Sequence, residues 1–169
     1  PAAPPGGNGG AVTPGEAEGG ERLLALLDRS RDAIVDEATE ALSGPATRRY
    51  STATPAENRE RLERLHDLTA DCVRSRTLVP MVEHAQAVAR DRHAAGYDLQ
   101  DVQAAFNAFE EVLWRRITGE LSPEAYPRAF GLVSTVLGAG KEALAVEYVS
   151  LASRSHVGSL DLSELFRGA

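Results

Sequence analysis

The stretch LQDVQAAFNAFEEVLWRRI, residues 99–117, decides the fold class. Its apolar residues recur at steps of three and four, which places them on one face of an α-helix: Leu99, Val102, Phe106, Phe109, Leu113 and Ile117. Asp98 precedes the stretch as an N-cap, and Gly119 follows it as a stop signal. This spacing is typical of residues that pack between helices, so we predict a core helix of a bundle here.

The same spacing extends through the chain from Glu21 onward, and no alternation typical of a β-strand persists. We expect four further helices, over residues 21–42, 54–76, 80–96 and about 122–153. The second has the clearest start, because TPAE at residues 54–57 is a capping box with Pro at the first helical position. The prediction is an all-α, antiparallel bundle of about five helices, either a four-helix bundle or globin-like.

The two ends differ from this pattern. Residues 1–20 are rich in Gly and Pro and include only Val12 as a sizeable apolar residue, so we predict a disordered tail. Residues 21–154 form the predicted helical domain. Residues 155–169 include Leu160, Leu162, Leu165 and Phe166, which predicts a linker or a short docking helix. Since the sequence begins at Pro1, we expect a piece of a longer protein whose output domain follows at the C-terminus.

The composition limits the classes of function that we expect. The chain has 169 residues, with 18 basic and 25 acidic side chains and a net charge of −7, which fits one domain. Because affinity for nucleic acid comes largely from Lys and Arg, we expect no nucleic-acid partner. No run approaches the roughly 18 consecutive apolar residues that cross a bilayer, so we expect no membrane partner. The lone Cys72 indicates a reducing, cytoplasmic setting.

Residues able to do chemistry are present, but not in the arrangements that enzymes use. The four histidines show no HExxH motif and no metal-ligand spacing with cysteine, so we expect neither a metal nor a cofactor. Cys72 lies on the inward stripe of its predicted helix, which favours packing over nucleophilic catalysis. Adjacent carboxylates in a helix point in different directions, so they do not form an acid–base pair. We therefore expect no enzymatic activity.

Two sets of residues are candidates for binding. Four aromatic residues suit a cavity for an apolar molecule or a haem held by a histidine: Phe106, Phe109, Trp114 and Tyr148. Three glycines interrupt the long last helix, each costing roughly 1 kcal/mol relative to Ala: Gly131, Gly138 and Gly140. We interpret these glycines as points of close approach for another helix, either of the same chain or of a second subunit.

Several stretches resemble one known family. They are AVARDRHAAGYDLQDV at residues 87–102, LLALLDRSRDAIVDEATEAL at 23–42, the region around Tyr50, and LAVEYVSLASR at 144–154. Together they resemble the N-terminal domain of RsbT co-antagonist proteins of the RsbRD type. The resemblance implies a helical, often dimeric sensory module that precedes an output domain in bacterial signalling proteins, and it brings no catalytic residues. We therefore expect a non-enzymatic, homodimeric regulatory domain of a signalling or stress response, coupled to a C-terminal output domain or a signalling partner.

Overall fold

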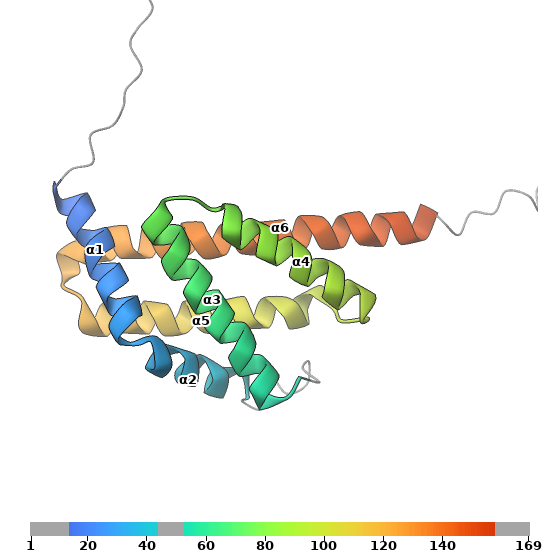
Figure 1. Cartoon of the computed structure of the whole chain (residues 1–169), viewed down its shortest axis with the longest axis horizontal. Coiled ribbons are helices and arrows are strands. Elements are labelled where there is room, and N and C mark those ends of the chain that lie inside the picture. The colour runs from blue at the N-terminus through green and yellow to red at the C-terminus, as the bar shows by residue number, and fades with distance from the viewer. Residues whose placement is uncertain (1–13, 44–52, 158–169) are drawn as a thin grey trace, which may run out of the picture.

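The computed structural model describes residues 14–43 and 53–157, and this part of the chain is helical without a strand (Figure 1). Its elements in chain order are α1 (Pro14–Arg29), α2 (Arg31–Leu42), α3 (Pro55–Ser75), α4 (Val79–Ala94), α5 (Leu99–Glu120), the 3-10 helix η1 (Pro123–Ala125) and α6 (Tyr126–Val157). The prediction of an all-α bundle is confirmed.

Helices α5 and α6 run antiparallel and form the long axis of the molecule (Figure 1). α6 has its most extensive contacts with α4 and α5, whereas α2 packs against α5 and α3. α3 crosses α5 and α6 obliquely in Figure 1. This arrangement leaves a junction where α3, α4 and α5 meet, and the candidate site described below lies there.

The predicted inward face of α5 is the centre of the core. Phe109, Leu113 and Ile117 are fully buried, and Phe106 is nearly so. Leu99 and Val102 near the start of α5 are only partly buried and pack against the edge of the core. Since burying a Leu or Phe side chain stabilises a fold by about 1.5–3 kcal/mol, this face accounts for much of the attachment of α5.

The helix ends follow the local sequence signals. In the capping box, the Glu57 N–H donates to Thr54 Oγ1 at 3.2 Å, and the Thr54 N–H donates to Glu57 Oε2 at 2.7 Å. Gly96 adopts a left-handed φ of 78°, and the Tyr97 N–H donates back to the Arg92 carbonyl at 3.0 Å. These two hydrogen-bonding patterns place the start of α3 and the end of α4 close to the predicted positions.

The helix predicted over residues 21–42 is wrong in one respect, because it is divided into α1 and α2 at Ser30. Ser30 has φ −111° and ψ 15°, outside the helical range. The break lets α1 pack against α6 and α3 while α2 packs against α5. Backbone hydrogen bonds still link Ser30 to Leu26 and Ile34, and the apolar stripe stays in phase across the break. The spacing of the apolar residues therefore gave no indication of the break at Ser30.

The bound at residue 20 predicted for the disordered tail needs correction, because α1 begins at Pro14. Gly19 is buried, and a Cβ placed on it would stand 2.8 Å from Cβ of Arg128 in α6. The glycine that suggested a flexible tail therefore permits a close contact between two helices. Residues 1–13 and 158–169 lie outside the described residues, and with them the docking turn predicted around Leu160 and Phe166.

One helical segment of the described chain, Pro123–Arg154, has the length of a membrane span and contains an 18-residue window whose mean hydropathy, 1.3, is apolar enough for one. The sequence prediction did not anticipate this, because it looked for an uninterrupted apolar run. Within the bundle, α6 contributes the fully buried Val133, Leu137 and Leu144 to the core. A core helix of a soluble protein passes the same test of length and composition.

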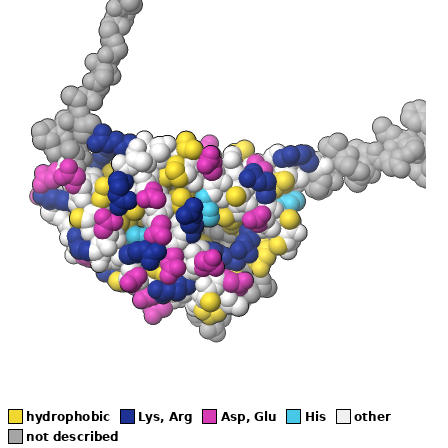
Figure 2. All heavy atoms as spheres, in the orientation of Figure 1, with side chains coloured by type: hydrophobic (Ala, Val, Ile, Leu, Met, Phe, Trp, Pro, Cys, Tyr) yellow, Lys and Arg dark blue, Asp and Glu magenta, His cyan; other side chains and the backbone are white. Residues whose placement is uncertain are grey.

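Charges of both signs are interspersed over the face seen in Figure 2. Many of them form ion pairs between helices, such as Arg59 with Asp36 and Arg29 with Glu120. Such exposed pairs each contribute little to stability, about 0–1 kcal/mol. Their main consequence is that positive and negative side chains neutralise one another on this face.

Candidate functional site

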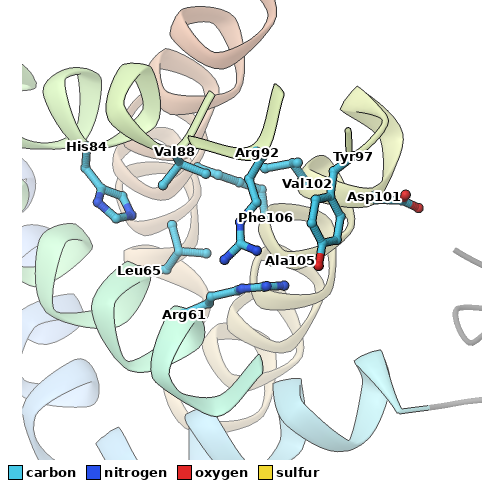
Figure 3. Close-up of a pocket in the computed structure, with 10 residues that line it drawn as sticks. All are labelled: Arg61, Leu65, His84, Val88, Arg92, Tyr97, Asp101, Val102, Ala105 and Phe106. Carbon is cyan, nitrogen blue, oxygen red and sulfur yellow. The ribbon is translucent and has the colours of Figure 1, made fainter. Parts of the chain in front are cut away.

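A cavity of about 70 Å³ lies at the junction of α3, α4 and α5 (Figure 3). Three elements and one turn supply its lining, which consists of Arg61, Leu65, His84, Val88, Arg92, Tyr97, Asp101, Val102, Ala105 and Phe106. The cavity holds several water-sized atoms. It is therefore large enough for a small ligand.

Two arginines from different helices converge on this cavity. Figure 3 shows Arg61 of α3 and Arg92 of α4 with their guanidinium groups directed toward each other. Within the described part of the chain, neither forms an ion pair with a carboxylate. The Arg92 guanidinium carbon lies 5.1 Å from the centre of the Tyr97 ring, a cation–π contact. Glu57 at the start of α3 attracts both guanidinium groups but forms no ion pair with either, so the pair places positive charge at the cavity.

Arg61 is the more deeply placed of the two. Its Nη1 donates to Asn58 Oδ1 at 3.2 Å, but its Nε and Nη2 are buried and have no hydrogen bond partner among the described residues. Burial lowers the pKa of Arg61, and the charge of Arg92 lowers it further. Arg61 is consequently held in a position that disfavours its own charge.

The acidic residue of the lining does not neutralise the arginines. Asp101 stands on α5, and Figure 3 shows its carboxylate directed away from Arg61, on the far side of Tyr97. Its Oδ1 is buried without a hydrogen bond partner among the described residues. His84, on the opposite side of the cavity, has its pKa lowered by burial and by the charge of Arg64. A neutral imidazole at this position adds no positive charge near pH 7.

The opposite wall of the cavity is apolar. It is formed by Leu65 of α3, Val88 of α4, and Val102, Ala105 and Phe106 of α5. One end of the cavity therefore offers positively charged hydrogen bond donors, and the other offers hydrocarbon. This arrangement suits a ligand with one anionic end, and it contains no nucleophile with an adjacent base. In the described ranges, no group of three His, Cys, Asp or Glu residues suited to a metal ion was found.

Compared with known families, the chain matches the one described as "RsbT co-antagonist protein rsbRD N-terminal domain" over residues 18–156. The chain belongs to this family. No curated protein and no solved structure matches it. This RsbRD domain is accordingly a regulatory signalling domain, of a family that acts in the partner-switching system of the stress response. Its family is not a known enzyme family. The resemblance found in the sequence is confirmed.

The four aromatic residues predicted to bind a ligand are not gathered in one cavity of the RsbRD domain. Phe106 lines the cavity described above, whereas Phe109 is in the core, with its ring edge-on to His66 at 6.2 Å between centroids. Trp114 is 45% exposed and packs against Phe130 at a ring distance of 6.2 Å.

Tyr148, the fourth of these aromatic residues, lies on α6 beside the turn that follows α4. Its hydroxyl donates to the Tyr97 carbonyl at 3.4 Å, and its ring is edge-on to His93. This hydrogen bond ties α6 to the residue that forms one side of the cavity. Tyr148 therefore supports the site from outside its lining.

The three glycines of α6 have different surroundings. A Cβ on Gly140 would come within 2.7 Å of Phe106 and 3.0 Å of Met81, so this glycine permits a close contact inside the chain. A Cβ on Gly131 or Gly138 would meet nothing within 4 Å. The contact of these two with a second subunit stays a prediction. Cys72 is buried in the core, as the sequence indicated.

The arginines of the cavity were missed in the sequence. In the sequence, Arg61 stands in a run with Arg59 and Arg64 that alternates with Glu57, Glu60 and Glu63, a pattern typical of an exposed face on which opposite charges cancel. The signal that identifies it is its spacing, because Arg61 precedes the buried Leu65 by four residues and so shares its face of α3. Arg92, Val88 and His84 have the same four-residue spacing on α4. Nothing in the sequence indicated that these two faces meet.

Proposed function

We propose that this regulatory domain is a homodimer joined along α6, and that α6 passes its conformational state to a C-terminal output domain or signalling partner. The setting we propose is the bacterial cytoplasm. The observation that carries the proposal is the outward face of α6, which is solvent-exposed and nearly free of charge. A stable surface helix normally presents charged and polar residues on that side.

The exposed residues of α6 between 131 and 153 are Gly131, Ser134, Thr135, Glu142, Val146, Val149, Ala152 and Ser153. Glu142 is the one charged residue among them. Val146 and Val149 are 63% and 64% exposed, which is unusual for valines of a folded domain. The neighbouring charges are turned toward the bundle, with Lys141 bound to Glu110.

The two outer glycines support the same interface. Gly131 and Gly138 cost the helix about 1 kcal/mol each relative to Ala, and no atom of the described chain uses the space that they leave. A second copy that approaches closely along this face would use it. A symmetric pair of α6 helices also buries the same small-residue surface on both subunits.

The length of α6 supports its role in transmission. It contacts α1, α3, α4 and α5, and its C-terminal turns extend past the other helices (Figure 1). A shift in the packing of the bundle would therefore move the end of α6. A signal acts on such a helix only if it binds two helix packings with different affinity.

The test is the mass of the domain in solution, measured by light scattering at several concentrations. We expect a dimer for the natural sequence and a monomer for Gly138→Leu and Val146→Glu, with unchanged helical circular dichroism. Val79→Glu is the matched control, since Val79 is 57% exposed but lies on α4. A monomeric natural domain, or a Val146→Glu variant that stays dimeric, would overturn the proposal.

A further inference from the structure

We infer that the cavity between α3, α4 and α5 is a binding site for the carboxylate of a short organic acid. The proposal goes beyond the regulatory function and does not depend on dimerisation. It rests on three observations: two converging guanidinium groups, a hydrogen-bonding edge of Arg61 without a partner, and an apolar wall in a cavity of limited size.

The first observation concerns charge. Arg61 and Arg92 face each other across the cavity, and the described residues place no carboxylate in an ion pair with either (Figure 3). Like charges in a partly desolvated place repel more strongly than in water. An anion between them converts this repulsion into two attractive contacts. The pair is thus arranged for a negatively charged ligand.

The second observation identifies the anionic group. The unpartnered nitrogens of Arg61 are Nε and Nη2. Elsewhere in this domain, Arg31 uses the same two nitrogens to bind both oxygens of the Asp67 carboxylate, at 2.9 and 3.0 Å. Two parallel N–H groups match the spacing of carboxylate oxygens, which makes this edge of arginine selective for planar anions. Arg61 therefore presents to the cavity a carboxylate-binding edge that no described carboxylate occupies, with the Tyr97 hydroxyl beside the guanidinium group.

The third observation limits the rest of the ligand. Beyond the guanidinium groups, the lining is Leu65, Val88, Val102, Ala105 and Phe106. The space of about 70 Å³ within the cavity matches a chain of a few carbon atoms. Inorganic phosphate would place its polar oxygens against the hydrocarbon wall. The lining therefore favours a short aliphatic acid over an inorganic anion.

The test uses butyrate as the probe, with butyramide as a neutral ligand of nearly the same shape and inorganic phosphate as a second anion. Binding is measured by titration calorimetry and by the shift of the melting temperature. We expect butyrate to bind and to raise the melting temperature, whereas butyramide has no effect and phosphate binds at least tenfold more weakly. Equal effects of butyrate and butyramide, or tighter binding of phosphate, would overturn the proposal.

Variants of the arginines localise the effect. Arg61→Met and Arg92→Met should each weaken butyrate binding at least tenfold, and Arg74→Met, at an exposed position near the other end of α3, should leave it unchanged. Without butyrate, Arg61→Met should melt at the same or a higher temperature, because it removes a partly buried charge that has no ion pair among the described residues. Arg61→Lys keeps the positive charge but removes the two parallel N–H groups of the guanidinium, so this variant should also bind butyrate weakly. Undiminished binding by Arg61→Lys and Arg92→Met would contradict the assignment.

Discussion

Gly140 of α6 lies directly against Phe106 of α5, so that a Cβ on the glycine would stand 2.7 Å from Cε1 of the ring. The side chain of Met81 occupies the other side, with its sulfur 3.1 Å from the same point. Phe106 also lines the cavity at the junction of α3, α4 and α5. The absence of a side chain at this position of α6 thus determines how closely α6 approaches α5, and the same contact connects α6 to the candidate site.

We predict that Gly140→Ala destabilises the domain by about 1–2 kcal/mol, because the added methyl group overpacks the buried Phe106 and Met81. Gly119→Ala in α5 is the matched control, since a Cβ there meets nothing within 4 Å. It should stabilise α5 by up to about 1 kcal/mol through helix propensity. Urea unfolding measures both, and equal stability of the two alanine variants would show that the contact is not tight.

The Arg31–Asp67 pair predicts a dependence on pH. Hydrogen bonds from Arg31, with a smaller contribution from His66, hold the pKa of Asp67 below its usual range. A lowered pKa in the folded state contributes stability above the usual carboxylate range, and this stability is lost as the pH falls through the lowered value.

Asp67→Asn should therefore be less stable than the natural domain at pH 7, and the difference should shrink below about pH 4. Because the Asp67 side chain is 46% exposed, we expect a difference of no more than about 1 kcal/mol at pH 7. Thermal unfolding from pH 7 to 3 checks this. Glu60→Gln, an exposed change on the same helix, should show no such convergence, and a constant deficit in Asp67→Asn would contradict the assignment.

The capping box of α3 predicts the effect of a single hydroxyl. Thr54→Ala leaves the Glu57 N–H without its side-chain acceptor and should cost about 1 kcal/mol. Thr54→Ser keeps the acceptor and should be nearly neutral. Hydrogen exchange should show faster exchange of the Glu57 amide in the alanine variant alone. Equal exchange in both variants would mean that the cap contributes little.

The ion pair between Lys141 of α6 and Glu110 of α5 should show a measurable coupling free energy. Lys141 Nζ donates to Glu110 Oε2 at 2.7 Å, and their side chains are 27% and 14% exposed. Lys141→Met leaves the less exposed carboxylate unpaired, so we expect a loss of about 1–2 kcal/mol. Adding Glu110→Gln should recover part of the loss. A double-mutant cycle measures the coupling, and additive single effects would show that the pair contributes nothing.

Much of the fold could be predicted because its signals are local. The capping box at Thr54 and the left-handed turn at Gly96 involve residues within five positions of each other, so their hydrogen bonds follow from the sequence alone. The buried face of α5 follows from the spacing of its apolar residues. The break at Ser30 did not follow, because the stripe of buried residues continues in phase through it and only contacts with α3, α5 and α6 require the change of direction.

The candidate site depended on contacts that no local pattern contains. By itself, the sequence determined the helices, their caps and the inward face of each, since these depend on interactions between near neighbours along the chain. The tertiary structure alone decided that Arg61 and Arg92 face the same cavity and that Gly140, unlike Gly131, touches another helix. Those relations arise from the angles at which helices cross, and the angles are set by the packing of the whole core.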